Sequence, residues 1–183
     1  MTIIEPTEFS QIVSIIDAEN VVASPTDTIY GLVCKYDAEP AIAKIYEIKH
    51  RPLVKALPIL VANWEQATEL GLFDEHLIRY LEDEFPLGHI TVIVKKQTIL
   101  NKIVYWNQWD TVAIRVTHDP LLQNIINTIG PLAGTSCNLS GAKPINDSSK
   151  IKLPGLEYIV RGSIVKPQAS IIYDSLNKKM LRS

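Results

Sequence analysis

Hydrophobic residues recur every three or four positions in several segments of the chain, a spacing that predicts amphipathic helices. Thr7 is a suitable N-cap for the first of these helices, whose apolar positions end at Ile16. A second helix is predicted to end at Lys49, because Arg51 precedes Pro52 and a residue before proline avoids helical geometry. The helices predicted in this way cover residues 7–16, 38–49, 63–70, 74–84 and 119–129.

Short apolar runs between these helices predict buried β-strands. The run at 111–116 carries Arg115 near its end. By contrast, residues 97–110 are expected to form an excursion over the surface, with Trp106 and Trp109 leaning on the core. The predicted strands cover residues 21–23, 56–61, 90–94, 111–116, 132–135, 157–160, 170–173 and 179–182.

The order of these elements predicts the fold class. Helices and strands alternate in the first part of the chain and strands dominate the last part, which favours an α/β (α+β) domain with a twisted mixed β-sheet flanked by helices. With 183 residues, of which 46% are hydrophobic and 21% charged, the chain can bury a core without disulfides. We therefore expect residues 1–183 to form a single domain.

The overall charge and the cysteines disfavour several functional classes. The net charge is −2, so no global field draws the chain onto nucleic acid, and any anion site must be local. Cys34 and Cys137 belong to no C-x-x-C pair and have no histidine at metal-ligand spacing, which favours a reduced, cytoplasmic protein. The N-terminus shows no signal-peptide pattern, and no apolar run approaches the roughly 20 residues of a transmembrane helix. We expect no association with a membrane.

A cluster of positive charge stands between the second predicted helix and the strand that follows it. Lys49, Arg51 and Lys55 lie within seven residues, and Pro52 stiffens the connection that carries them. A guanidinium offers phosphate oxygens a planar pair of donors, whereas an ammonium acts as a point charge. The cluster is therefore either a solvated basic turn or one wall of a phosphate site, and the residues alone leave both open.

Two further turns are rich in hydroxyl and amide side chains. The turn at 25–28 places Thr26, Asp27 and Thr28 after a predicted strand. It is either a capped turn or a site for a small polar ligand, in which Asp27 would receive an ammonium group or help to hold a metal ion. The turn at 135–141 lacks the G-x-S-x-G pattern, and nothing pairs it with a histidine, so serine hydrolysis is not favoured.

Arg115 stands near the end of an otherwise apolar strand. It either forms a salt bridge or faces a ligand crevice at the edge of the sheet. The chain contains neither G-x-x-x-x-G-K-[ST] nor G-x-G-x-x-G, so neither a P-loop nor a Rossmann dinucleotide site is supported. A nucleotide site would have to be built from other residues.

Four segments of the chain form an ordered set of motifs. They read SPTDTIYGL at 24–32, IYEIKHRPLVKALP at 45–58, TVAIRV at 111–116 and LAGTSCNLSG at 132–141. In type and order these motifs resemble the YrdC/Sua5 family, the threonylcarbamoyl-AMP synthases, and the length resembles the single-domain, TsaC-like members. The resemblance implies a YrdC-like (dsRBD-like α/β) fold with a central positively charged cavity.

The resemblance also implies an activity, that of a nucleotidyltransferase. Members of the family convert L-threonine, bicarbonate and ATP into L-threonylcarbamoyladenylate and pyrophosphate. Mg²⁺ accompanies the ATP, and no protein ligand for the metal is expected. The reaction is the first step in forming N6-threonylcarbamoyladenosine at position 37 of tRNA, and transferase proteins receive the product. The resemblance leaves open whether this chain contacts tRNA directly.

The positions of the family's motifs assign roles to residues of this chain. Lys49 and Arg51 are expected to act in catalysis, although the division of labour between them and Lys55 is open. The resemblance places ATP contacts at Arg51, Lys55, Thr111, Asn138, Asn146 and Arg182. It places L-threonine contacts at Thr28, Arg115, Ser136 and Ser170, with Arg115 on the carboxylate.

Some positions depart from the family pattern. Residues 85–91 read FPLGHIT where a Trp-Pro-Gly-Pro-x-Thr segment is usual, Ile171 stands where threonine is common, and the chain stops one residue after Arg182. These departures bear on the shape of one loop and on the contacts of the tail more than on the activity.

Two other functions compete with the synthase. One is an RNA-binding module that uses the same basic cavity, and the net charge of −2 counts against it. The other is a carbamoyl-transfer domain of the kind fused in hydrogenase-maturation proteins, and the lack of further domains counts against that.

Overall fold

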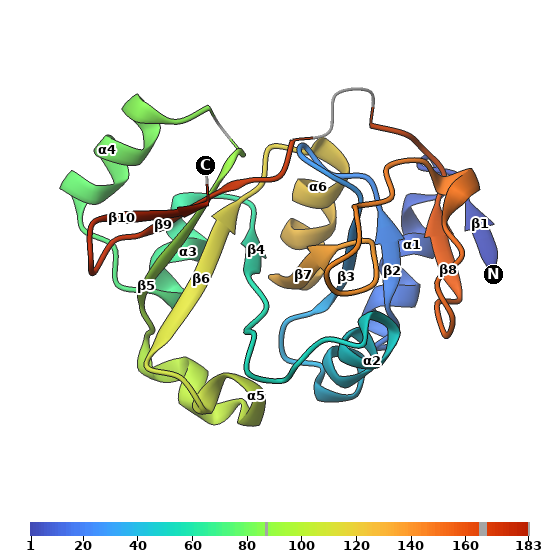
Figure 1. Ribbon diagram of the computed structural model, residues 1–183, viewed down its shortest axis with the longest axis horizontal. Helices are drawn as coiled ribbons and strands as arrows, with labels where there is room; N and C mark the ends of the chain where they lie inside the picture. Colours follow the sequence, from blue (N-terminus) through green and yellow to red (C-terminus); the bar gives the residue numbers. More distant parts are fainter. Residues whose placement is uncertain (87, 165–167, 183) are drawn as a thin grey trace.

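Ten strands form one continuous sheet in the computed structural model, which describes residues 1–86, 88–164 and 168–182. Figure 1 shows this sheet twisting through the molecule with helices packed around it. The strand order is β1-β8-β2-β3-β7-β4-β6-β5-β9-β10. The strands are β1 (Thr2–Ile4), β2 (Val22–Ser24), β3 (Gly31–Lys35), β4 (Ile59–Val61), β5 (Ile90–Lys95), β6 (Thr111–Val116), β7 (Leu132–Ser136), β8 (Tyr158–Val160), β9 (Ile171–Asp174) and β10 (Lys179–Arg182).

The sheet is mixed. Strands β1, β8 and β2 run parallel to one another, and so do the pairs β4–β6 and β5–β9. The other neighbours, β2–β3, β3–β7, β7–β4, β6–β5 and β9–β10, are antiparallel. The predicted α/β fold with a twisted mixed sheet flanked by helices is therefore confirmed.

The helices begin close to where the sequence pattern places them. Asn63 and Asp74 cap their helices as hydrogen-bond acceptors for the backbone N–H three residues on, at 2.9 and 2.7 Å. The prediction of Thr7 as a cap is wrong, because the first helix starts two residues later with Glu8 at the N-cap. The α-helices are α1 (Phe9–Asp17), α2 (Glu39–Lys49), α3 (Trp64–Leu70), α4 (Glu75–Glu84), α5 (Val104–Asn107) and α6 (Pro120–Ile129), with 3₁₀ helices η1 (Thr98–Lys102) and η2 (Ser148–Lys150).

Each face of the sheet has its own buried cluster. Ile12 of α1 and Ile126 of α6 share one cluster with Val33 of β3 and Leu60 of β4. Residues of α2, α3 and η1 belong to the other cluster, which also takes in the buried apolar side chains of β5 and β6. Among the described residues, no helix is long and apolar enough to cross a membrane.

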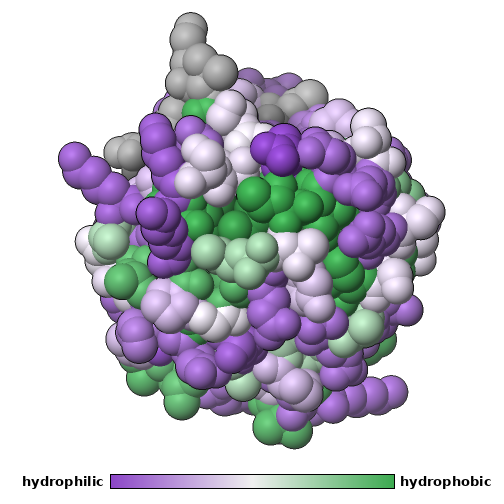
Figure 2. Space-filling model, turned by 90° about the vertical axis from the view of Figure 1, so that its right-hand side faces the viewer, coloured by the Kyte–Doolittle hydropathy of each residue, from purple (hydrophilic) through white to green (hydrophobic). Residues whose placement is uncertain are grey.

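The end of the sheet at β1 leaves apolar surface uncovered. Figure 2 looks onto this end and shows hydrophobic residues, in green, forming a continuous area with polar residues around it. Ile3 of the edge strand β1 is 45% exposed there.

Strands β1 and β3 are absent from the sequence-based prediction. In β3, Leu32, Val33 and Cys34 are all buried, so the strand lacks the alternation that marks a strand with one exposed face. Gly31 also ends a polar turn in the sequence, which hides the start of the strand. This miss matters, because β3 lies near the centre of the sheet.

The excursion at 97–110 carries two short helices, η1 and α5, that the pattern does not reveal. Trp106 is buried there, and its indole Nε1 donates to Tyr36 O at 2.7 Å. The expectation that Trp106 leans on the core is confirmed. In the loop predicted at 85–89, Leu87 lies outside the described residues.

The positive cluster straddles the end of a helix. Lys49 is the last residue of α2, and His50 follows in the left-handed conformation at φ 48°. Arg51 and Lys55 lie on the connection to β4. The prediction that this helix ends at Lys49 is therefore confirmed, but the expectation that the connection presents the side chain of Lys49 is wrong, because that side chain is buried.

Candidate functional site

A cavity of about 530 Å³ lies over the central strands. Val33 and Leu60 line it and also belong to the cluster packed by α1 and α6, so the cavity opens on that face of the sheet. Successive side chains of a strand point to opposite faces, and residues two apart therefore line the cavity together. Such pairs are Gly31 and Val33, Thr91 and Ile93, Ala113 and Arg115, and Gly134 and Ser136.

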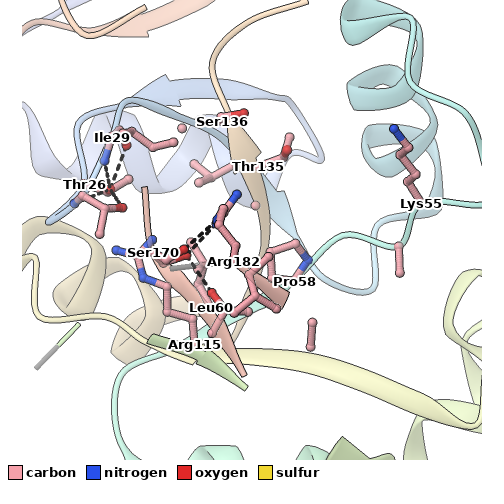
Figure 3. A pocket seen from close by; sticks show the side chains of 18 of the residues that line it. Thr26, Ile29, Lys55, Pro58, Leu60, Arg115, Thr135, Ser136, Ser170 and Arg182 are labelled. Atoms are coloured by element: carbon pink, nitrogen blue, oxygen red, sulfur yellow. Dashed lines mark hydrogen bonds between the residues drawn. The ribbon is translucent and has the colours of Figure 1, made fainter. Parts of the chain in front are cut away.

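Positive side chains dominate the charged groups of the cavity wall. Among the described lining residues, Arg51, Lys55, Arg115 and Arg182 are cationic and none is an aspartate or glutamate. In Figure 3, Lys55 and Arg115 lie on opposite sides of the view, with Arg182 between them. That the cavity as a whole is positively charged stays a prediction, because Arg115 is ion-paired. The cavity brings together seven of the predicted site residues: Thr28, Arg51, Lys55, Arg115, Ser136, Ser170 and Arg182.

Arg51 folds the connection between α2 and β4 back on itself. Its Nε donates to Lys55 O at 3.0 Å, and its Nη2 donates to Ala56 O at 2.8 Å. The hydroxyl of Tyr46, from α2, also donates to Lys55 O at 2.7 Å. Two bonds from one guanidinium fix its plane, so Arg51 is held at the cavity wall, while Lys55 is exposed.

Lys49 lies outside the cavity lining that the structure describes, and it clamps the turn after β7. Its ammonium donates to the backbone oxygen of Ser136, to Asn138 O at 2.7 Å and to Asn138 Oδ1 at 3.3 Å. The residue is 1% exposed. Burial, and then the charge of Arg51, lowers the pKa of Lys49 to about 8. Its observed contacts are structural, and its catalytic role stays a prediction.

The other predicted nucleotide contacts border the cavity without lining it in the described chain. Asn138 donates from Nδ2 to Leu139 O and Ala142 O, both at 2.7 Å, and so fixes its own turn. Asn146 Oδ1 accepts from Tyr30 N at 3.1 Å. Thr111 lies on β6 two residues before Ala113, on the face that Ala113 and Arg115 share. The roles of Thr111, Asn138 and Asn146 toward ATP stay predictions.

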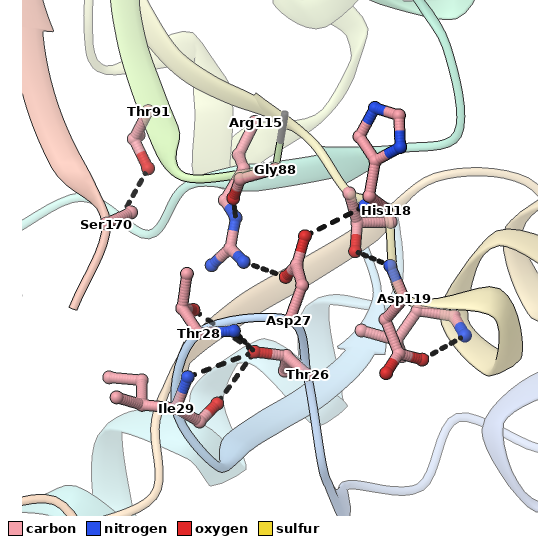
Figure 4. A network of polar contacts seen from close by, with 12 residues as sticks. Thr26, Asp27, Thr28, Ile29, Gly88, Thr91, Arg115, His118, Asp119 and Ser170 are labelled. Atoms are coloured by element: carbon pink, nitrogen blue, oxygen red, sulfur yellow. Dashed lines mark hydrogen bonds and ion pairs between the residues drawn. The ribbon is translucent and has the colours of Figure 1, made fainter. Parts of the chain in front are cut away.

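Arg115 is the centre of a network drawn in Figure 4. Its Nη2 donates to Asp27 Oδ1, and its Nε donates to Gly88 O at 2.8 Å. Burial lowers the pKa of Arg115, and the carboxylate of Asp27 opposes this shift. The sequence left two alternatives open for Arg115, and both are correct. Arg115 forms a salt bridge, and it also lines the cavity.

Asp27 is committed to protein contacts. While Oδ1 binds Arg115, Oδ2 accepts from the backbone N–H of His118 at 2.8 Å. These contacts count against the prediction that Asp27 receives a ligand's ammonium group or helps to hold a metal ion. In the described chain, no group of three or more His, Cys, Asp or Glu is placed to hold a metal ion.

Arg182, in the last strand, is held against Ser170. Its Nε donates to Ser170 O at 2.8 Å and its Nη2 to Ser170 Oγ at 3.1 Å. The hydroxyls of Thr91 and Ser170 share a hydrogen bond of 2.9 Å. This arrangement ties β5 and β10 to the residue before β9 and places a guanidinium among hydroxyl groups.

Sequence reasoning places Thr26 in a candidate ligand turn but misses Thr91 and much of the apolar wall of the cavity. The hydroxyl of Thr26 accepts from Thr28 N at 3.0 Å and donates to Ile29 O at 2.8 Å, so it shapes the turn before β3. The sequence could have revealed part of this wall. Ala113 stands two residues before Arg115 on the same predicted strand, so both side chains point to the same face. The missed apolar lining residues include Val33, Leu60, Ile93, Ala113, Ile172 and Leu181.

Comparisons with known sequences agree on one family. The Sua5/YciO/YrdC family, whose description is Telomere recombination, matches residues 14–183. A threonylcarbamoyl-AMP synthase of Vibrio campbellii is 32% identical over 150 residues, which cover 79% of this chain and 79% of the relative. A threonylcarbamoyl-AMP synthase of Vibrio parahaemolyticus is 31% identical over 184 residues, which cover 95% and 97%.

A solved structure shares the fold. P. abyssi Sua5 complexed with L-threonine matches with a TM-score of 0.82 at 26% sequence identity. The match covers 96% of this chain and 55% of that chain, so this chain spans about half the length of P. abyssi Sua5.

Proposed function

The chain belongs to the Sua5/YciO/YrdC family, and we propose that it is an L-threonylcarbamoyladenylate synthase, a nucleotidyltransferase. In this proposal, L-threonine, bicarbonate and ATP with its Mg²⁺ enter the cavity, and threonylcarbamoyladenylate and pyrophosphate leave it. The names of the relatives and the threonine complex of P. abyssi Sua5 support this function over an RNA-binding module.

One observation carries the proposal, namely that a single cavity has two different sets of anion-binding groups. Arg51 and Lys55 stand on a loop at one side, and Arg115 stands on the other side (Figure 3). A polyphosphate needs several cations, whereas one guanidinium binds a single carboxylate. We assign the side of Arg51 and Lys55 to the ATP phosphates and the side of Arg115 to the carboxylate of threonine.

Hydroxyl groups of the cavity lining suit the rest of the amino acid. Thr28, Ser136 and Ser170 line the cavity and offer donors and acceptors to an ammonium, amine or hydroxyl group. We propose that they orient the amine of L-threonine toward the nucleotide. Arg182, which Ser170 holds, would bridge the two sides by contacting the nucleotide.

The chemistry takes two bond-forming steps in this proposal. The amine nitrogen of threonine attacks the carbon of bicarbonate or CO₂ and loses a proton, which gives a carbamate and, from bicarbonate, water. A carbamate oxygen then attacks the α-phosphorus of ATP, and the bond from that phosphorus to the bridging oxygen breaks to release pyrophosphate. Both steps depend on positioning and on neutralised charge, which the cations of the cavity wall supply.

Mg²⁺ would enter as part of the ATP substrate. The described cavity wall offers cations and hydroxyl groups but no carboxylate, so it lacks the hard anionic ligands that bind Mg²⁺ directly. Its ligands would be phosphate oxygens and water, and we assign no protein residue to the metal. We also propose that residues 1–183 act as one domain in the cytoplasm and that transferase proteins use the product to modify tRNA.

The direct test is pyrophosphate release by the purified protein. With ATP, Mg²⁺, bicarbonate and L-threonine we expect release that stops when threonine is omitted. Folded protein that releases no more pyrophosphate with threonine than without it would contradict the synthase. Tight tRNA binding that ATP does not displace would favour the RNA-binding module instead.

Arg51→Ala tests the assignment of the phosphate side. We expect kcat/KM for ATP to fall by about 100-fold, because charge-assisted hydrogen bonds to phosphate contribute about 1.5–3 kcal/mol each. Leu53→Ala is the matched control, since Leu53 stands on the same connection and is 67% exposed. Wild-type turnover in Arg51→Ala would refute the assignment.

A further inference from the structure

Asp27 lies between two cavity-lining residues, Thr26 and Thr28, and turns its side chain toward Arg115 (Figure 4). Its side chain is 11% exposed, and that of Arg115 is 9% exposed. As an ion pair in so little water, the two groups interact more strongly than a surface pair would. Asp27 is therefore placed to act on the cavity through another residue rather than by contact with a ligand.

Arg115 is held at two points that come from different parts of the chain. Asp27 Oδ1 accepts from Nη2, and the backbone oxygen of Gly88 accepts from Nε. Gly88 has φ 77°, and a Cβ built there would overlap Asp27 Oδ2. The close approach of Asp27 to a glycine thus brings both acceptors to the same edge of the guanidinium. Two anchors on a planar group fix its orientation.

Asp27 is itself anchored by a backbone group. Its Oδ2 accepts from His118 N at 2.8 Å, just beyond the end of β6, the strand that carries Arg115. Both carboxylate oxygens are therefore occupied, and the carboxylate cannot rotate away from Arg115 without losing a bond. Protein groups alone therefore set the orientation of the arginine.

A preset arginine binds a carboxylate at lower entropic cost than a mobile one. Ordering one long side chain on binding costs enough free energy to weaken affinity by about twofold to tenfold. We propose that Asp27 is a positioning residue, which holds the Arg115 guanidinium in the orientation that receives the carboxylate of the amino-acid substrate. This inference rests on the proposed function, and it adds a residue outside the described cavity lining to the recognition of threonine.

The first test compares KM for L-threonine with KM for ATP in the Asp27→Ala variant. We expect KM for L-threonine to rise about tenfold while KM for ATP stays within about twofold of the wild type. Asp74→Ala is the matched control. It also removes a carboxylate that accepts from a backbone N–H, but this carboxylate lies at the start of α4. Its two KM values should match those of the wild type.

Two further measurements separate positioning from a merely structural role. Formate can occupy the space of the missing carboxylate, so it should lower KM for L-threonine in Asp27→Ala but not in the wild type. L-Threoninamide has no carboxylate for Arg115 to bind, so its KM should be the same in the variant and the wild type.

Each outcome decides the inference. An unchanged KM for L-threonine, or an equal rise in both KM values without formate rescue, overturns it. If Asp27→Ala does not fold, Asp27→Asn keeps the side-chain volume, and a rise in KM for L-threonine alone supports the inference while unchanged values overturn it. If the wild type releases no pyrophosphate, the synthase proposal fails separately, and calorimetry of L-threonine binding then decides. A tenfold loss in Asp27→Ala supports the inference, and equal or absent binding overturns it.

Discussion

Two regions bring cations to the same cavity, and they are built in different ways. In the phosphate-side loop, residues 51–56, Arg51 binds backbone oxygens four and five positions further along the chain. In the arginine network, Asp27, Gly88 and Arg115, the arginine binds partners that are 27 and 88 residues away in sequence. Contacts within one short segment set the position of Arg51, whereas segments far apart in the sequence must come together to fix Arg115.

The largest expected effect concerns the arginine network. Arg115→Ala should lower kcat/KM for L-threonine by at least about 100-fold, because a bidentate, charge-assisted contact is lost. The change also leaves Asp27 buried without its partner, which costs about 3–5 kcal/mol of stability. Steady-state kinetics on folded protein measures the first effect, and denaturant unfolding measures the second.

Two variants sharpen the test of Arg115. Arg115→Lys keeps the positive charge but loses the planar pair of donors, so it should recover stability better than activity. Arg79→Ala removes an exposed arginine paired with Glu75 on α4, and it should change neither quantity. Wild-type kinetics with L-threonine in Arg115→Ala would contradict the assignment of threonine to Arg115, and with it the distinction between the two regions.

The next effect concerns Lys49, which links the regions. Lys49 ends α2 just before the phosphate-side loop and clamps the turn that carries Ser136. Its pKa of about 8 in the folded protein lies below its ordinary value of 10.5, so the folded state binds fewer protons between these two pH values. Stability should therefore rise with pH through that window, by up to about 3 kcal/mol from this group.

Urea unfolding at several pH values measures this effect as the difference between the wild type and Lys49→Met. The difference in unfolding free energy should become more favourable to the wild type from about pH 8 to pH 10.5. Burial raises the pKa of the neighbouring Cys137 to about 12, so its thiol stays protonated there. A difference that does not vary with pH would show that Lys49 is charged throughout this range.

The smallest effect concerns Lys55. Its exposed ammonium should contribute only a point charge to phosphate binding, so Lys55→Ala should raise KM for ATP by roughly threefold. Salt should shrink this effect, because the Debye length falls from about 10 Å at 0.1 M to about 3 Å at 1 M. Lys102→Ala removes an exposed lysine of η1 and serves as the control. An effect of Lys55→Ala that salt leaves unchanged would indicate a buried, direct contact instead.

The comparison also explains what the sequence can predict. Arg51 and Lys55 stand in one short segment beside Pro52, so their common location on a connection is visible in the sequence and is confirmed. The N-caps Asn63 and Asp74 are predictable for the same reason. Each capping side chain accepts from a backbone N–H only three residues further along the chain.

Long-range contacts set the limit of prediction. The buried strand β3 has apolar residues on both faces, so no alternation reveals it, and without β3 the cavity has no floor at Val33. Lys49 looks like a member of a basic loop until the turn after β7 supplies its three acceptors. The pairing of Asp27 with Arg115 depends on the sheet order, which local patterns do not encode.

The assignment of one anion to each region can be tested most directly by equilibrium binding. Calorimetry would measure L-threonine and a non-hydrolysable ATP analogue, separately, on Arg51→Ala and Arg115→Ala. We predict that Arg51→Ala loses affinity for the nucleotide but binds threonine as the wild type does. Arg115→Ala should lose affinity for threonine but bind the nucleotide as the wild type does. A variant that loses both ligands while folded, or that loses the opposite one, would contradict the two-sided cavity.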